Sequence, residues 1–321
     1  MIKRNTDLSQ HRILITGING MIGTALRKRF QRTHFDVYGI DIEPSKWNFD
    51  TKADVLELDL CNPNVEPDFL GDIDSIIHAA ANARVSKLVG NPEMAHENIQ
   101  MTRTVLEWAR KYNIPNVLFL SSREVYGNQK QTIAAEEHVT LDTIESPYAA
   151  SKLSAEALLR SYANCYDINW SVLRLSNVYG RYDAKDRVVP LFLSNAYFGE
   201  PLKIYGDEKI LDFTYIEDVI QGILKCIFEF PTASGEVFNI ASGKGSSLRN
   251  LAEMLLSKTD SDSDIVVKSE RKGEVERFVA DITKAKKLLS YTPQMDLETG
   301  LEPTIDWYMN RPSILEGVQN R

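Results

Sequence analysis

The chain has 321 residues and a formal net charge of −8, with 43% hydrophobic and 26% charged residues. This composition is typical of a globular protein with one large domain or two ordinary ones. The acidic balance argues against a nucleic-acid-binding protein, whose binding face is usually basic. The first ten residues are polar, and no apolar run approaches the roughly 18 residues of a membrane helix. The sequence therefore predicts neither a signal peptide nor a membrane span.

Strand and helix patterns alternate through the first half of the chain. Strands are expected at Arg12–Thr16, Phe35–Ile40, Val55–Leu58, Ile73–His78 and Asn116–Leu120, with helices at Met21–Gln31 and Pro92–Tyr112. The alternation predicts an α/β fold with a Rossmann-like, doubly wound parallel sheet that has helices on both faces.

The rhythm changes after Leu175, where loops lengthen and Gly and Pro become more frequent. Strands are expected at Leu202–Tyr205, Val237–Ile240 and Asp264–Lys268, and helices at Ile216–Phe228, Leu248–Ser257 and Leu297–Met309. We predict a dinucleotide-binding domain over 1–175. A smaller mixed α/β region over 176–321 is expected mainly to bind substrate, with an interleaved boundary.

Three widely spaced cysteines, Cys61, Cys165 and Cys226, form no metal-ligand pattern, so no metal site is predicted. An odd and sparse set favours buried free thiols over a disulfide framework, and it favours a reducing, cytoplasmic location.

A glycine-rich turn joins the first expected strand to the first expected helix, with glycines at Gly17, Gly20 and Gly23. Gly17 permits a tight turn, Gly20 lets the backbone approach a pyrophosphate, and Gly23 allows close packing of helix and sheet. The N-terminus of the following helix offers free N–H groups to phosphates. Strand, turn and helix together predict a dinucleotide site.

Asp41 ends the second expected strand, close to 20 residues after the turn. An acidic residue there accepts hydrogen bonds from ribose hydroxyls and repels a 2′-phosphate, which favours NAD over NADP. Asp59 follows the third strand and is expected near the adenine.

Tyr148 and Lys152 lie four residues apart in an expected helix, so they project from one face. A cation beside a phenol favours the phenolate, which can take a proton from an alcohol. Ser122 follows a central strand, at the sheet edge where ligands bind, and is expected to face the nicotinamide. The adjacent Ser121 is compatible with a capping role.

These motifs resemble those of the extended short-chain dehydrogenases/reductases, in particular the NAD-dependent nucleotide-sugar epimerase/dehydratase family with its UDP-sugar 4-epimerases. The resemblance covers nearly the whole chain in order. It rests on Thr16–Gly23, His78–Ala81, Asn98, Ser121–Gly127, Tyr148 with Lys152, Leu173–Gly180, Pro201–Asp218, Arg271–Glu274 and Ala280–Ala285.

The resemblance implies roles for the catalytic residues. Ser122 would hydrogen-bond the sugar 4-hydroxyl, and Tyr148 would remove its proton as hydride passes from C4 to NAD. Lys152 would hold the nicotinamide ribose and lower the pKa of Tyr148. Further contacts to NAD are implied for Asn19, Met21, Ile22, Leu60, Ala79, Ala80, Ala81 and Asn98.

The resemblance also implies a site for a nucleotide-diphosphate sugar, formed by Ser122, Arg123, Asn177, Arg187, Val188, Tyr205 and Arg271. Tyr205 would lie against the nucleobase, although an ordinary strand residue fits as well. Arg271 would reach the diphosphate, although a solvated basic residue fits as well. Leu211 stands where many relatives carry an Arg that grips the diphosphate, so Arg187 or Arg271 is expected to compensate. Its loss argues against decarboxylase activity.

Three functions remain open at this point. The first is a 4-epimerase acting on a UDP-hexose or UDP-hexuronate through a transient 4-keto sugar. The second is a 4,6-dehydratase or related lyase with Glu124 as base, although Arg123 replaces the Asp of dTDP-glucose dehydratases and Glu124 is also compatible with a simple surface pair. The third is a non-catalytic NAD-binding regulator, which the intact Ser122, Tyr148 and Lys152 disfavour.

Two further expectations concern partners. The resemblance implies a homodimer formed through the helices expected at Pro92–Tyr112 and Pro147–Tyr166. Arg84, Lys87 and Arg123 are compatible either with contact to a hexuronate carboxylate or with solvation.

Overall fold

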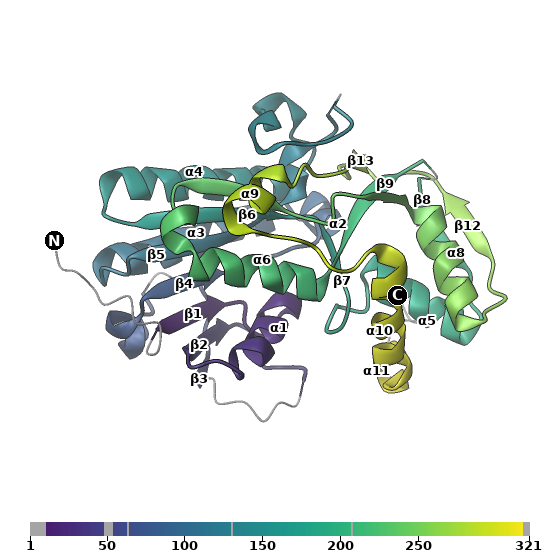
Figure 1. Cartoon of the computed structure of the whole chain (residues 1–321), viewed down its shortest axis with the longest axis horizontal. Helices are drawn as coiled ribbons and strands as arrows, with labels where there is room; N and C mark the ends of the chain where they lie inside the picture. Colours follow the sequence, from purple (N-terminus) through teal and green to yellow (C-terminus); the bar gives the residue numbers. More distant parts are fainter. Residues whose placement is uncertain (1–10, 48–53, 63, 130, 207, 317–321) are drawn as a thin grey trace.

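The computed structural model describes residues 11–47, 54–62, 64–129, 131–206 and 208–316. Its main element is a seven-stranded parallel sheet with the strand order β10-β6-β5-β4-β1-β2-β3 (Figure 1). The strands are β1 (Arg12–Thr16), β2 (Asp36–Asp41), β3 (Asp54–Glu57), β4 (Ser75–His78), β5 (Asn116–Ser122), β6 (Asn169–Leu175) and β10 (Glu236–Ile240). The predicted doubly wound sheet is confirmed.

Helices cover both faces of this sheet. Leu14 of β1 packs into one core with Trp108 and Leu159, whereas Ile13 packs into another with Phe30. Successive side chains of a strand point to opposite faces, so β1 is buried on both sides, as a central parallel strand requires. The first core lies under α3 (Glu93–Lys111) and α4 (Pro147–Cys165), and the second under α1 (Met21–Phe30) and α6 (Ile216–Phe228).

A smaller region lies beyond the carboxyl ends of the strands and carries two further small sheets (Figure 1). Its elements are β7 (Asn177–Tyr179), β8 (Leu202–Tyr205), β9 (Ile210–Tyr215), β11 (Gly245–Ser247), β12 (Ile265–Lys268), β13 (Arg277–Phe278), α5 (Val188–Phe198), α8 (Leu248–Thr259), α10 (Leu297–Met309) and α11 (Pro312–Leu315). The remaining helices are α2 (Val85–Gly90), α7 (Phe230–Ala233) and α9 (Thr283–Leu289).

The chain returns from the smaller region to the main sheet. The expected strand Val237–Ile240 is present as β10, but it pairs with β6 at the edge of the seven-stranded sheet. Helix α6 likewise packs against α1. The division at 175/176 stays a prediction. Strand β10 and helix α6 come after it in the sequence but pack onto elements that come before it.

Several elements had no sequence expectation, among them β6, α5 and β9. Strand β6 mixes the polar residues Asn169, Ser171 and Arg174 with apolar ones, and α5 has Pro190 in its first turn, so the usual periodicity is interrupted. The cysteine expectation is wrong for Cys165, which is exposed; Cys61 is half-buried, and all three thiols are free.

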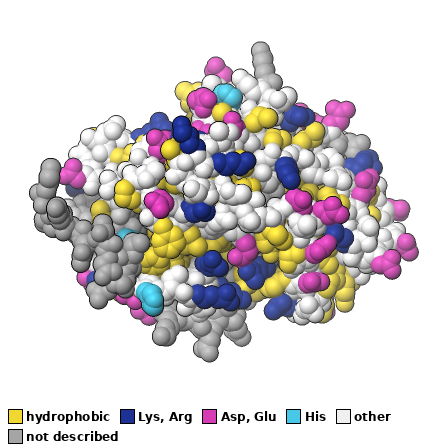
Figure 2. All heavy atoms as spheres, in the orientation of Figure 1, with side chains coloured by type: hydrophobic (Ala, Val, Ile, Leu, Met, Phe, Trp, Pro, Cys, Tyr) yellow, Lys and Arg dark blue, Asp and Glu magenta, His cyan; other side chains and the backbone are white. Residues whose placement is uncertain are grey.

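On the face drawn in Figure 2, Lys and Arg side chains are interspersed with Asp and Glu side chains and with apolar ones.

Within the described residues, no helix combines the length and the apolar character needed to cross a bilayer. The same part of the chain holds no group of three or more His, Cys, Asp or Glu residues arranged to bind a metal ion.

Candidate active site

The glycine-rich turn is packed so tightly that side chains are excluded from it. Gly17 has a φ of 70°, and a Cβ there would lie 2.8 Å from the backbone nitrogen of Ala80. A Cβ on Gly23 would lie 2.3 Å from the carbonyl oxygen of Gly17. Helix α1 then begins at Met21 after Gly20, with no side chain capping its first N–H groups. These N–H groups are available to an anion, as a pyrophosphate site needs.

A cavity of about 430 Å³ extends from this turn to the ends of β2 and β3. Asp41 faces it, and its carboxylate accepts hydrogen bonds from the backbone N–H of Asn19 (2.8 Å) and of Glu43 (3.1 Å). Asp59 also lines the cavity and accepts the N–H of Cys61 at 2.8 Å. Other predicted cofactor residues on its wall are Gly17, Asn19, Gly20, Leu60, Ala79, Ala80 and Ala81. The cavity has the carboxylates of Asp41 and Asp59 at the ends of the strands and the uncapped N-terminus of α1 at the glycine-rich turn. This arrangement suits an adenosine diphosphate moiety.

Asn98, which the resemblance implies as a contact to NAD, is buried in a network of hydrogen bonds, and its role toward NAD stays a prediction. Its amide lies in α3, where it donates to the carbonyl oxygen of Asn82 and to Oγ of Ser151, both at 3.1 Å. Its Oδ1 accepts the N–H of Asn82 at 2.7 Å. Asn98 lines neither cavity around the turn and instead joins the loop after β4 to α4.

A second cavity, of about 290 Å³, continues from the turn over the carboxyl ends of β5 and β6. Ser122, Tyr148 and Lys152 all line it and are all buried. Lys152 donates from Nζ to the carbonyl oxygen of Leu120 at 2.9 Å, and its Nζ lies 6.0 Å from the centre of the Tyr148 ring. The side chain of Ser122 favours the phenolate of Tyr148 and so opposes the rise of its pKa. The structure thus brings Ser122, at the end of β5, together with the two residues that the sequence placed on one helix, Tyr148 and Lys152.

Burial dominates the electrostatics of this trio. It raises the pKa of Tyr148, against the opposing effects of Arg187 and of the Ser122 hydrogen bond. It also lowers the pKa of Lys152 to about 8, against the opposing charge of Glu156. In the chain by itself, burial therefore outweighs the groups that favour the phenolate of Tyr148, because desolvation penalises the charged form. The lowering of the Tyr148 pKa by Lys152 in the presence of NAD stays a prediction.

The buried ammonium of Lys152 should reduce the stability of the folded chain. Below pH 8 the group is protonated in both the folded and the unfolded state, and the folded state carries the full desolvation cost. As the pH rises from about 8 toward 10.5, the folded protein loses the proton first and the cost fades. We expect Lys152→Met to be more stable than the wild type at pH 7, by about 1–3 kcal/mol, and this advantage to vanish near pH 10.5. Urea unfolding across this range measures it. An advantage independent of pH, or one shared by the exposed control Lys287→Met, would contradict the expectation.

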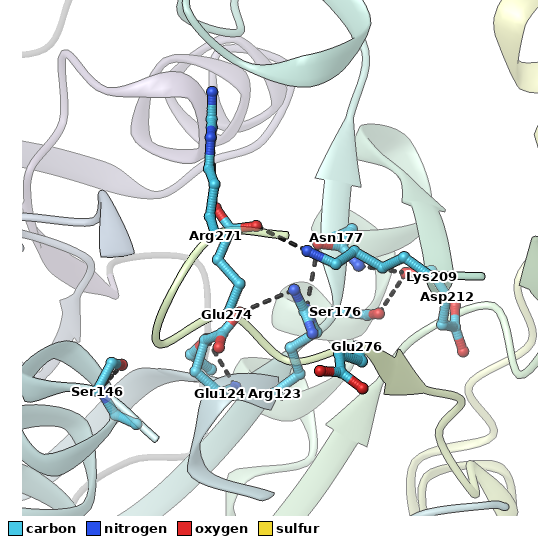
Figure 3. Close-up of polar contacts among 12 residues, drawn as sticks. Arg123, Glu124, Ser146, Ser176, Asn177, Lys209, Asp212, Arg271, Glu274 and Glu276 are labelled. Atoms are coloured by element: carbon cyan, nitrogen blue, oxygen red, sulfur yellow. Dashed lines mark hydrogen bonds and ion pairs between the residues drawn. The ribbon is translucent and has the colours of Figure 1, made fainter. Parts of the chain in front are cut away.

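Arg123 and Glu124 enter the cavity next to Ser122. The Arg123 guanidinium pairs with Oε1 of Glu124 at 2.8 Å and donates from Nε to Oδ1 of Asn177 at 3.1 Å. Figure 3 shows these side chains as one group, with Arg123 and Glu124 from the end of β5 and Asn177 from β7. Glu124 is therefore a buried, paired carboxylate and not a surface residue.

The other predicted substrate residues divide into two groups. Asn177, Arg187 and Val188 line the cavity, and Arg187 also donates to the carbonyl oxygen of Ala83 at 3.1 Å. Tyr205 and Arg271 line neither cavity around the turn, but they contact each other. The Arg271 guanidinium lies 3.7 Å from the centre of the Tyr205 ring.

Two buried charged residues were missed from the sequence. Asp183 lines the cavity, and burial raises its pKa to about 6. Lys209 lies just before β9 and lines neither cavity, but it is buried and pairs with Glu274 at 2.8 Å. Its place two residues before Leu211 was the available signal.

Helix α4 is fixed to the sheet by a buried ion pair. Arg174 of β6 donates two hydrogen bonds to Glu156 of α4, at 3.0 and 2.8 Å, and one to the hydroxyl of Tyr126 at 3.1 Å. Ser121 donates to the same Glu156 carboxylate at 2.6 Å. Ser121 lines the cavity, and its hydroxyl joins this network, where it helps to position the helix that carries Tyr148 and Lys152.

Comparison with known proteins agrees with this geometry. The family model described as "NAD dependent epimerase/dehydratase family" matches residues 13–241. A putative UDP-glucose 4-epimerase of Methanocaldococcus jannaschii is 29% identical over 93% of this chain and 98% of its own. A dTDP-glucose 4,6-dehydratase of Escherichia coli is 28% identical over 96% of each chain. The solved structure of a UDP-glucuronic acid 4-epimerase from Bacillus cereus, in complex with UDP-glucuronic acid and NAD, superposes with a TM-score of 0.85 at 27% identity. It covers 93% of this chain and 99% of that one.

Proposed function

Because the chain belongs to the NAD-dependent epimerase/dehydratase family, with NAD as its cofactor, we propose that it is a nucleotide-sugar 4-epimerase acting on a UDP-hexose or UDP-hexuronate. The observation that carries the proposal is the burial of Ser122, Tyr148 and Lys152 in one cavity that adjoins the glycine-rich turn. When bound, NAD supplies the acceptor and donor of the C4 hydride.

The proton chemistry falls to the side chains of the chain. Ser122 and Tyr148 line the same cavity, and the side chain of Ser122 favours the phenolate of Tyr148, so a sugar hydroxyl entering beside them meets a path for its proton. The Lys152 ammonium is close enough to stabilise a phenolate on Tyr148 once the hydroxyl proton is shared. Return of the proton to the same oxygen completes an epimerisation, which needs no external redox partner.

Glu124 is the observation that favours the dehydratase alternative. Its Oε2 has no hydrogen-bond partner and Glu124 lines the cavity, so a proton acceptor is present. Its other oxygen is held in an ion pair by Arg123 at 2.8 Å, so elimination through Glu124 would have to use Oε2.

Proton NMR of the protein with NAD in deuterated water, offered a panel of UDP-, dTDP- and GDP-sugars, tests the proposal. A sugar inverted at C4 without deuterium at C5 is the expected result. A 4-keto product with solvent deuterium at C5 or C6 would contradict it and would favour elimination through Glu124.

Lys209 is proposed to compensate for the missing Arg at Leu211. Glu274 pairs with Lys209 at 2.8 Å and lies 3.8 Å from Arg271, so one carboxylate holds two cations (Figure 3). A diphosphate carries more negative charge than Glu274 and can take its place between them.

We expect Lys209→Met to raise KM for the nucleotide sugar by about 10- to 100-fold, because one charge-assisted hydrogen bond is lost. If Lys209 binds the diphosphate equally strongly in the ground state and in the transition state, kcat should stay within about threefold of the wild type. Lys203→Met, an exposed lysine on β8, is the matched control. An unchanged KM would exclude Lys209 from the diphosphate site.

A homodimer through α3 and α4 is also proposed. The two helices pack against each other, and α4 exposes the small residues Ala150 and Ala157, which allow close approach of a second helix pair. Light scattering of the purified protein tests this, and a monomeric mass would refute it.

A further inference from the structure

Two buried polar atoms beside the reacting residues lack a partner. Arg123 and Glu124 pair with each other, and their side chains are only 10% and 7% exposed. Nη1 of Arg123 and Oε2 of Glu124 nevertheless have no hydrogen-bond partner. Leaving a buried polar atom unsatisfied costs about 1–3 kcal/mol, and here the two residues line the same cavity. Such a pair points to a ligand group that satisfies both atoms.

The two side chains are held in place and are not free to rearrange. Nε of Arg123 is bound to Asn177 at 3.1 Å, and its guanidinium lies 5.8 Å from the centre of the Phe278 ring. Glu124 is anchored through its backbone N–H, which donates to Oγ of Ser122 at 3.2 Å. Ser122 in turn lines the cavity together with Tyr148. The unpartnered donor and acceptor are therefore fixed next to the position where C4 of the sugar reacts.

The chemistry of the pair selects the group that fits. A hydroxyl can accept from the Nη1–H of Arg123 and donate to Oε2 of Glu124 at the same time. A carboxylate can satisfy only Arg123, and it would bring a second negative charge against Glu124 in a desolvated pocket. The guanidinium is already neutralised by Glu124, so the pair offers no net positive charge to attract an anion.

We propose that Arg123 and Glu124 together bind the C6 hydroxyl of a neutral hexose and reject the C6 carboxylate of a hexuronate. The inference rests on the proposed function, since it places C4 at Ser122 and Tyr148, and it narrows the substrate class to UDP-hexoses. C6 is bonded to C5, the ring neighbour of the reacting C4. It carries a hydroxyl in a hexose and a carboxylate in a hexuronate. The pair attracts the C6 hydroxyl of a hexose, and Glu124 repels the C6 carboxylate of a hexuronate. Specific binding sites commonly combine attraction of one ligand with repulsion of another.

Binding to the NAD-loaded Tyr148→Phe protein, measured by calorimetry, separates recognition from turnover. UDP-glucose is expected to bind at least about 10-fold more tightly than UDP-glucuronate and than a UDP-6-deoxyhexose, because each analogue leaves at least one buried polar atom unsatisfied. A smaller difference for either analogue, or tighter binding of the uronate, overturns the inference.

Glu124→Gln in the same background isolates the charge. This change keeps the size of the side chain, so the penalty against UDP-glucuronate should fall by at least about 10-fold. The exposed Glu276→Gln is the matched control and should leave the penalty unchanged. An unaltered penalty in Glu124→Gln overturns the role of Glu124. A wild type that converts neither UDP-glucose nor UDP-glucuronate but still binds UDP-glucose more tightly would contradict the proposed epimerase activity. The same result would support the recognition of the hydroxyl by Arg123 and Glu124.

Discussion

Tyr148→Phe is expected to lower kcat by about 10²- to 10⁴-fold, the usual contribution of a positioned acid–base group. The phenol ring would keep its packing, since Tyr148 is buried against Leu88 and Ala95, so the fold and the dinucleotide site should be retained. Only the phenolic hydroxyl is removed from the cavity that Tyr148 lines together with Ser122. Turnover and the NAD content of the purified protein measure the two effects separately.

The matched control is Tyr166→Phe, an exposed tyrosine directly after α4. Its activity should equal that of the wild type. Full activity in Tyr148→Phe would remove Tyr148 from the proton path and with it the proposed mechanism. Loss of both NAD and activity would instead assign Tyr148 a role in holding the cofactor site.

Arg174→Met is expected to lower the free energy of unfolding by about 3–5 kcal/mol, because it leaves the Glu156 carboxylate buried without its cation. Both side chains are only 4% exposed, so water cannot replace the lost partner. Urea unfolding of NAD-free protein measures the change without the added stability of a bound cofactor.

Two further variants test whether the loss of stability in Arg174→Met comes from the burial of the ion pair. Arg12→Met breaks an exposed pair with Asp72, whose side chains are 40% and 66% exposed, and should cost less than about 1 kcal/mol. The double variant Arg174→Met/Glu156→Leu removes both charges and should recover part of the loss. A single variant as stable as the wild type would mean that Glu156 finds another partner, for which Lys152 is a candidate because the charge of Glu156 already acts on its pKa.

Much of the first half of the fold could be predicted because its signals are local. The strand at Arg12–Thr16, the glycine turn and the helix α1 follow from apolar runs and from the turn chemistry of Gly17. The pair of Tyr148 and Lys152 was predictable because helical spacing alone puts both on one face. Asp41 was predictable in the same way, from its place at the end of a strand.

The charged side chains at the site were harder to place. Glu124 was compatible with a surface position until β5 and β7 brought Arg123 and Asn177 against it. Lys209 carried no recognisable motif, and its pairing with Glu274 joins residues 65 positions apart. Arg271 was expected at a diphosphate, yet in the chain by itself it lies on Tyr205.

The sequence by itself determined the class of the fold, the dinucleotide turn and the choice of Ser122, Tyr148 and Lys152 as the candidate catalytic trio, because these depend on short-range geometry. Only the tertiary structure decided the electrostatic state of that trio. Burial raises the pKa of Tyr148 and lowers that of Lys152, and desolvation arises only when distant elements close over a side chain. The unsatisfied atoms of Arg123 and Glu124 are likewise a property of the closed cavity, since in an open chain water would satisfy both.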